Sequence, residues 1–327
     1  MLGVGTYTKP YLPPSGQVAL LQSRGMIITD PVKAELCLAR IGYYRLSAYW
    51  YPFRATQTSV GANGAPVTST LDQFKPDTTF LAALDLYVFD KKLRMITLDA
   101  LERVEIALRT SIALLLGVNG RDAHRQPALL HGNFAKKVDP ITNQTGHQKW
   151  LKKLDDAFDN SREEFVKHFK ERYDQSNLPI WMAVELWDFG MLSKFFAGMR
   201  VHDKDKIAAD LGIPSGRVLE SWLRSLNVTR NICAHHSRLW NRPSVTQPLW
   251  QLASTMPTLS HISADVHAQT RYYASAVMLK FLLGKINPSS KWHDRLKDLM
   301  SQFPASPHIT LRHAGFPSGW QSLPLWQ

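Results

Sequence analysis

A long segment without glycine or proline limits how this chain can fold. Neither residue occurs from Thr78 to Leu116, and the apolar side chains return every three or four positions, the spacing that places them on one face of a helix. The segment predicts one long helix that ends at Gly117, or two helices separated near Asp90. The apolar positions are Leu84, Val88, Leu101, Val104, Leu108 and Leu115.

The rest of the sequence has a mainly helical pattern, which predicts an all-α fold. Asp30 and Pro31 supply an N-cap and a proline at the first helical position. The Gly-, Ser- and Thr-rich segment from Arg54 to Pro76 indicates an exposed loop or hairpin. Further helices are expected at residues 17–25, 147–160, 162–173, 180–187 and 191–199, from Ser215 to a point before Pro243, and at about 264–283.

The length of 327 residues suggests about two domains. We expect an N-terminal segment with an aromatic block and a loop at residues 1–75, a helical domain at residues 76–285, and a basic, Pro- and Ser-rich C-terminal tail at residues 286–327. The aromatic block, Ile41–Phe53, has two interpretations. Its rings could stack on single-stranded bases, or they could form core beneath a loop, which is the commoner arrangement.

The charge of the chain favours polyanionic partners. Lys and Arg number 39 against 27 Asp and Glu, a net charge of +12 with a pI near 9.7, and basic side chains that contact phosphates release condensed counterions. The apolar stretch Tyr272–Leu283 is too short to span a bilayer and contains Lys280. No signal peptide is visible, and Cys37 and Cys233 form no paired motif, so we expect a reduced, cytoplasmic protein without a membrane partner.

The segment from Ser215 to Asn241, drawn as a helix, divides into an apolar stripe and a basic face. No acidic residue follows Glu220 in this segment. The stripe, expected to be buried, contains Val218, Trp222, Leu226, Thr229, Cys233, His236 and Trp240. The opposite face contains Arg224, Asn227, Asn231, His235 and Arg238, with Arg230 between the two faces.

The basic face carries groups that suit an anionic, hydrogen-bonding ligand. Guanidinium groups bind phosphate with paired donors, and histidine titrates near neutral pH, as proton transfer requires. The residue types alone leave an alternative open, in which this face packs against carbonyl groups of a neighbouring helix. A zinc site at Cys233 and His236 is disfavoured, because a structural zinc needs four ligands and no partner pair has suitable spacing.

Four motifs in order resemble a known family. Arg230 to His235 matches the Arg-x4-His signature of HEPN ribonucleases, including their Arg-Asn form. The wider string through Arg242 resembles the Abi family of bacterial abortive-infection proteins, of the AbiD/AbiF type. The other three segments are Ile41–Phe53, Phe89–Arg109 and Leu178–Ser193, and the resemblance spans about Lys9–Leu249. Two departures are Ala48, where glycine is expected, and Trp187-Asp188, where serine is usual before Phe-Gly.

The resemblance implies a HEPN-like helical bundle with a smaller N-terminal helical and aromatic segment. It also implies that the protein is a toxin of antiphage abortive infection that acts as a metal-independent endoribonuclease. In that reaction the ribose 2′-OH attacks the adjacent phosphorus. His235 would serve as acid or base, Arg230 as phosphate clamp, and Asn231 would orient the phosphate or the histidine. We assign RNA binding to the remaining polar residues of the motif region: Arg224, Asn227, His236 and Arg238.

The resemblance also implies partners. One motif supplies a single histidine, and HEPN enzymes pair two motifs across a dimer interface, so we expect a homodimer with a composite site. The 2′-OH requirement makes RNA the substrate. No cofactor and no metal are implied, whereas a neutralising antitoxin, either a protein or a small RNA, is implied.

Acidic and basic side chains on the long helix offer support for the motif. Glu102, Glu105 and Arg109 share one face with Arg94. Paired glutamates can perform acid–base work or bind metal, but they more often belong to ion pairs such as Glu105–Arg109. We therefore expect Glu102, Glu105 and Arg109 to support Arg230 or His235.

Two other functions remain open from the sequence. The Arg, Asn and His face could hold a structured RNA without cutting it, as a non-catalytic RNA-binding module. It could also contact proteins as a scaffold, which the net charge of +12 mildly disfavours.

Overall fold

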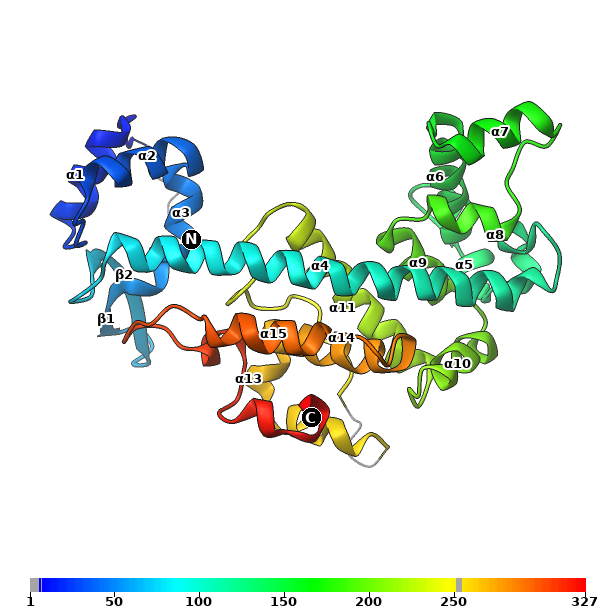
Figure 1. Cartoon of the computed structure of the whole chain (residues 1–327). Helices are drawn as coiled ribbons and strands as arrows, with labels where there is room; N and C mark the ends of the chain where they lie inside the picture. The colour runs from blue at the N-terminus through cyan, green and yellow to red at the C-terminus, as the bar shows by residue number, and fades with distance from the viewer. Residues whose placement is uncertain (1–5, 7, 251–254) are drawn as a thin grey trace. The chain divides into compact units, whose positions relative to one another are not determined.

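The computed structural model describes residue 6 and residues 8–250 and 255–327. Helices account for 62% of the chain and strands for 8%, which confirms the all-α prediction (Figure 1). The residues form two compact units. The first unit contains the chain up to Lys92 with Leu299–Leu311, and the second contains Leu93–Asp298 with Arg312–Gln327. The sequence-based division at residues 75 and 285 stays a prediction.

The first unit consists of short helices and one hairpin. Its 3₁₀ turn Tyr51–Phe53 leads into antiparallel strands that pair from Arg54↔Phe74 to Val60↔Pro66. The hairpin confirms one of the two options expected for residues 54–76. The elements are α1 (Pro14–Ser23), α2 (Pro31–Ile41), α3 (Tyr43–Trp50), β1 (Arg54–Val60), β2 (Pro66–Phe74) and the first part of α4 (Phe80–Gly117).

The described residues of the second unit are mainly helical, with one hairpin of two short strands. Its helices are the second part of α4, α5 (Gly132–Ala135), α6 (Gly146–Asn160), α7 (Glu164–Arg172), α8 (Ile180–Ala183), α9 (Phe189–Gly198), α10 (Val201–Asp210), α11 (Gly216–Ala234), α12 (Ser260–Ser263), α13 (Val266–Gln269), α14 (Tyr272–Ile286) and most of α15 (Trp292–Ser301). Its strands are β3 (Val138–Asp139) and β4 (Gln144–Thr145). Its 3₁₀ turns are Ala123–Arg125, Pro127–Leu129, Val184–Leu186, Pro257–Leu259, Leu311–Ala314, Trp320–Ser322 and Pro324–Trp326.

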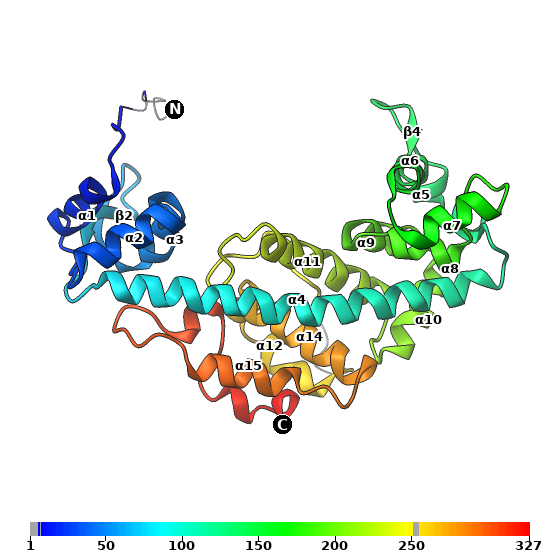
Figure 2. The ribbon, with the colours of Figure 1, turned by 45° about the horizontal axis from the view of Figure 1, so that its top comes forward.

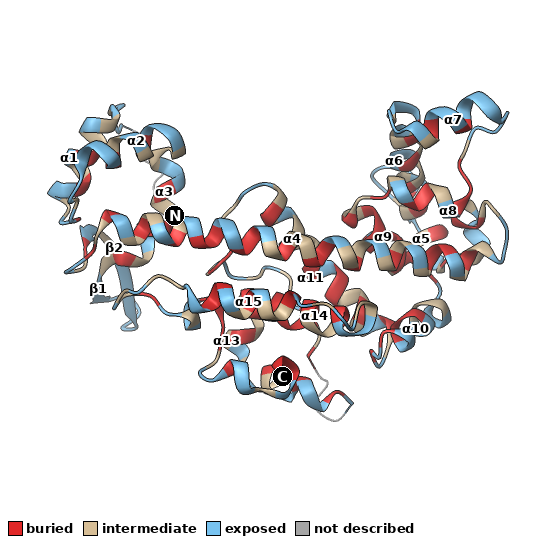
Figure 3. Ribbon diagram, viewed as in Figure 1, coloured by how far each residue is buried: buried red, intermediate tan, exposed pale blue. Residues whose placement is uncertain are grey.

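Helix α4 is uninterrupted, so the option of a break near Asp90 is wrong. Asp90 is fully buried, and its Oδ2 accepts a hydrogen bond from the Tyr49 hydroxyl at 2.7 Å, so the helix buries this carboxylate rather than ending there. Figure 3 shows buried and exposed residues alternating along α4, as expected of an amphipathic helix.

Half of the rings in the aromatic block are core. Tyr49, Trp50 and Phe53 are each 1% exposed or less, which leaves them no face for stacking on a base. Tyr44 is 91% exposed and Tyr51 is 52% exposed. The buried rings therefore anchor α3 in the first unit, whereas the exposed tyrosines keep surface that could meet a ligand.

The C-terminal region contains more helix than the sequence analysis predicted. One helix was expected at about 264–283, but the structure has two helices there. Asp265 caps the single turn of α13, and the extended backbone of Arg271 separates α13 from α14. Helix α15 was not predicted, although Trp292, Leu296 and Met300 have helical spacing. Helix α15 packs on α4, because the Trp292 indole donates to the Ile96 carbonyl at 2.7 Å.

No helix in the described part of the chain is long and apolar enough to cross a membrane. Helix α14, which contains the apolar stretch Tyr272–Leu283, is largely buried inside the second unit. Thr97 on α4 shares a 2.8 Å hydrogen bond with the Tyr272 hydroxyl on α14. The apolar surface of α14 therefore serves packing within this unit.

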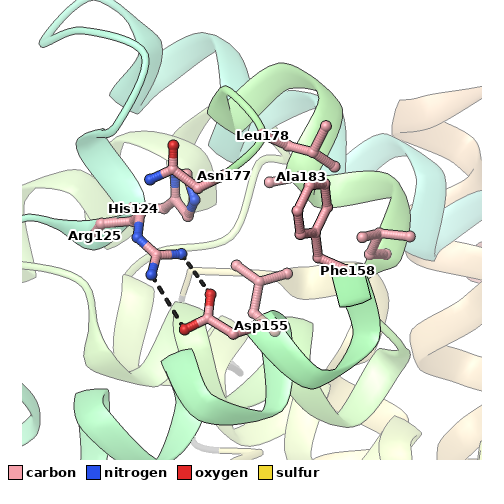
Figure 4. Close-up of a pocket in the computed structure, with 9 residues that line it drawn as sticks. His124, Arg125, Asp155, Phe158, Asn177, Leu178 and Ala183 are labelled. Carbon is pink, nitrogen blue, oxygen red and sulfur yellow. Dashed lines mark hydrogen bonds and ion pairs between the residues drawn. The ribbon is translucent and has the colours of Figure 1, made fainter. Parts of the chain in front are cut away.

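A small pocket in the second unit holds a buried histidine (Figure 4). Its empty volume of about 210 Å³ falls below the ~300 Å³ at which ligand pockets begin. His124 lines it with no exposed surface, and neither ring nitrogen has a hydrogen-bond partner among the described residues. Burial lowers the pKa of His124 to about 3, with Arg125 and His147 acting in the same direction.

Substitution of His124 tests the effect of this burial on stability. Because the folded-state pKa lies below the ordinary value of 6.5, the unfolded chain takes up a proton first as the pH falls. The free energy of unfolding should therefore fall by about 2 kcal/mol from this group between pH 7 and pH 5. Urea unfolding should show a smaller acid-induced loss in His124→Phe, whereas both proteins should behave alike between pH 8 and pH 7. Equal losses at pH 5 would contradict the prediction.

Candidate functional site

Three of the four sequence motifs meet around α11 in the second unit. Figures 1 and 2 both show α11 beside α4, and Arg94 Nη1 on α4 donates to the Ser237 carbonyl at 3.4 Å. Helix α9 contacts α11, with Gly190 against Asn227. A Cβ atom at Gly190 would lie 3.6 Å from Asn227 Oδ1, so the absence of a side chain allows this close approach.

Helix α11 begins at a serine cap and ends earlier than predicted. Ser215 Oγ accepts from the Val218 amide at 3.4 Å, and the last helical residue is Ala234. The Ser237 amide donates to the Ile232 carbonyl at 3.0 Å, and the His236 amide donates to the Cys233 carbonyl at 3.1 Å. These two bonds form a Schellman motif, which terminates a helix.

The early end corrects the predicted position of two side chains. His236 has a φ of +55° and is exposed, so it does not belong to the buried stripe. Arg238 lies beyond the helix and is half-buried. A helical wheel assumes constant rotation per residue, and this assumption fails where His236 adopts the left-handed conformation.

Arg230 and His235 are the least engaged polar residues of the Arg-x4-His motif. Arg230 is half-buried, and its hydrogen bond in the described chain is a long one from Nη1 to Asn231 Oδ1 at 3.4 Å. His235 is the exposed C-cap, and no ring hydrogen bond is found for it among the described residues. Asn231 is exposed. Guanidinium and imidazole groups are therefore available to an incoming ligand.

Two of the three predicted supporting residues lie near Arg230. Arg109 Nη2 donates to Glu105 Oε1 at 2.6 Å and also to the Trp187 carbonyl oxygen. Burial raises the pKa of Glu105, while the charges of Arg109 and Arg230 lower it, and the net shift is upward. Glu102 is exposed to solvent and has no ion pair in the described residues, so the structure does not bring it into this cluster.

Arg224 and Asn227 flank the motif on the N-terminal side. Arg224 is exposed and pairs with Glu220 at 3.1 Å, and Lys204 Nζ binds the other oxygen of Glu220 at 2.8 Å. Asn227 Oδ1 is buried without a hydrogen-bond partner in the described chain. Asn227 is therefore placed at the junction of α9 and α11 with unused hydrogen-bonding capacity, while Arg224 is partly neutralised.

Asp188 is a site residue that the sequence analysis did not select. Its Oδ1 accepts from the Met191 amide at 2.7 Å and so caps α9, and its Oδ2 accepts from Lys153 Nζ at 2.5 Å. Partial burial opposes ionisation, but the hydrogen bonds from Lys153 and Met191 and the charges of Lys153 and Arg230 hold the pKa of Asp188 below its usual value. The available signal was an aspartate directly before a helical Phe-Gly pair.

The two predicted catalytic groups differ in their surroundings. Arg230 is half-buried on α11, whereas His235 is the exposed C-cap at the end of this helix. Among the residues that the structure describes, no group of three or more His, Cys, Asp or Glu could hold a metal ion.

The left-handed His236 gives a test of the helix end. Glycine accepts positive φ without the steric cost that a Cβ atom brings, about 1 kcal/mol. His236→Gly should therefore unfold at a higher urea concentration than His236→Ala, although both lose the imidazole. A continuous helix through residue 241 would reverse this order, because alanine is favoured over glycine inside helices.

Comparison with known families agrees with the resemblance seen in the sequence. A model of the family described as Abi-like protein matches residues 36–241, which include α4, α9 and α11. No curated protein and no solved structure matches the chain. Membership of this family implies a role in abortive-infection defence against phage. Because the match covers more than half of the chain, the protein belongs to the Abi-like family, of the AbiD/AbiF type.

Proposed function

We propose that the protein is a metal-independent endoribonuclease toxin that cleaves cellular or phage RNA in the cytoplasm. The observation that carries this proposal is the contrast between engaged and available cations at the α4–α9–α11 junction. Arg109 is bound by Glu105 and Trp187, whereas Arg230 has only the long contact to Asn231. An arginine with unused paired donors suits a phosphate.

The proposed reaction needs one clamp and two proton transfers. The 2′-oxygen attacks the adjacent phosphorus and loses its proton to a base, while the bond from phosphorus to the 5′-oxygen breaks and that oxygen takes up a proton. The products carry a 2′,3′-cyclic phosphate and a 5′-OH. Arg230 stabilises the charge on the phosphoryl oxygens, Asn231 orients the phosphate, and His235 transfers a proton.

The proposed unit of activity is a homodimer. Two proton transfers require two groups or one group that acts twice, and one motif supplies a single catalytic histidine. The exposure of His235 at the end of α11 also favours a site completed by a second copy, in which the two motifs face each other. A toxin of this kind requires a neutralising partner, and we retain an antitoxin of protein or RNA as part of the proposal.

The first test is cleavage of labelled RNA in EDTA by wild type and His235→Ala. Wild type should release fragments that end in 2′,3′-cyclic phosphate, and His235→Ala should cut at least 100-fold more slowly, in the range expected for loss of a general acid or base. RNA binding should stay within about threefold of wild type, because the exposed imidazole contributes little to phosphate binding. Salt-dependent RNA binding without cleavage by either protein would favour the non-catalytic RNA-binding module.

The second test isolates mixed dimers with two affinity tags, one on wild type and one on His235→Ala. A composite site that needs both histidines predicts that the mixed dimer is nearly as inactive as the His235→Ala dimer. Two independent sites predict about half of the wild-type rate. A mixed dimer with His168→Ala, an exposed histidine on α7, serves as the control and should keep full activity.

A further inference from the structure

A row of alternating charges crosses the junction of α4, α6, α9 and α11. Its members in order are Arg109, Glu105, Arg230, Asp188 and Lys153. The outer residues form ion pairs, with nitrogen-to-oxygen distances of 2.6 Å between Arg109 and Glu105 and 2.5 Å between Lys153 and Asp188. Arg230 in the middle forms no ion pair within 4.0 Å among the described residues.

The carboxylate of Asp188 lies against the part of α11 that precedes Arg230. A Cβ atom at Gly190 would be 3.1 Å from Asp188 Oδ1 and 3.6 Å from Asn227 Oδ1, so both side chains border the same point. Arg230 follows Asn227 by one helical turn. Burial raises the pKa of both Asp188 and Glu105, and the charge of Arg230 is among the influences that lower the pKa of each.

Both carboxylates are restrained by partners other than Arg230. Lys153 holds Oδ2 of Asp188 while the Met191 amide holds Oδ1. Arg109 holds Glu105. Arg230 is therefore attracted from both sides without being neutralised by a direct contact. A carboxylate without such a partner would close onto the guanidinium and compete with phosphate.

We propose that Asp188, held by Lys153, is a positioning residue for Arg230 that orients the guanidinium for an RNA phosphate while leaving its donors free. This inference rests on the proposed ribonuclease function. Serine and aspartate can both cap α9, but only aspartate places a negative charge beside Arg230.

The main variant separates capping from charge. Asparagine caps helices about as well as aspartate, so Asp188→Asn keeps the bond to the Met191 amide and removes the charge. The same helix α6 offers a matched control in Lys149 and Asp139, which pair at 2.6 Å one turn earlier. Asp139 also accepts amide hydrogen bonds, from Ile141 and Thr142. Asp139→Asn therefore removes the same charge from a lysine-paired aspartate that does not belong to the row containing Arg230.

The first readout is the rate at which phenylglyoxal modifies Arg230, followed on its proteolytic peptide by mass spectrometry. The reagent attacks the uncharged guanidine, which a neighbouring carboxylate disfavours. Asp188→Asn should therefore raise the rate about threefold or more. Lys153→Met should lower it, because the released Asp188 closes onto Arg230, and Asp139→Asn should leave it unchanged. Equal rates in Asp188→Asn and Asp139→Asn would overturn the proposal.

The second readout is the division of the effect between turnover and binding of RNA. Misplacement of Arg230 should lower kcat of Asp188→Asn about tenfold without weakening RNA affinity, because a negative charge has been removed. Asp188→Glu, which restores the carboxylate, should recover most of the rate. A purely structural role predicts instead that Asp188→Asn and Asp139→Asn behave alike in both kcat and affinity.

The two readouts distinguish failure of this inference from failure of the proposed function. If wild type cuts RNA and Asp188→Asn cuts equally well, positioning by Asp188 is wrong and the ribonuclease stands. If wild type cuts no RNA, the ribonuclease is wrong. In that case, the rate at which phenylglyoxal modifies Arg230 still shows whether Asp188 and Lys153 affect the reactivity of its guanidinium.

Discussion

The contacts of Arg109 determine how the candidate site is assembled. Its guanidinium on α4 binds Glu105 on the same helix and the backbone carbonyl of Trp187, just before α9. Charge-assisted hydrogen bonds of this kind contribute about 1.5–3 kcal/mol each. Trp187 is fully buried, with ring centroids 4.9 Å from Trp150 and 4.7 Å from Phe195. The start of α9 is thereby fixed to α4, and the position of Asp188 follows.

Under the proposed ribonuclease function, this assembly would let a strongly basic chain present Arg230 as a well-defined phosphate clamp. A net charge of +12 gives nonspecific attraction to RNA, but attraction alone does not select one phosphate for reaction. Around α11 most cations are already paired, including Arg109, Arg224 and Lys153. Arg230 differs because the neighbouring carboxylates have other partners. Recognition of one particular phosphate would thus depend on which cationic side chains have no carboxylate partner, and this depends on the local ion pairs.

The sequence predicted the helices better than it predicted the ends of helices and the contacts between them. The α4 segment is long, periodic and free of Gly and Pro, so its helical character and its end at Gly117 were predicted, although a break near Asp90 stayed open. The end of α11 was missed because no glycine or proline marks it, and His236 takes the left-handed position usually given to glycine. Asp188 and Lys153 were not recognised as a pair, because residues far apart in sequence meet only through tertiary packing.

The two halves of the Arg-x4-His motif depend on different parts of the fold. Arg230 is half-buried within α11, which contacts α9 in the same chain. His235 stands at the end of α11 and is exposed to water, where a proton-transfer group lacks the exclusion of solvent and the fixed hydrogen bonds that catalysis uses. A surface that covers His235 would exclude solvent and could supply hydrogen bonds. In the proposed homodimer, the second copy provides that surface.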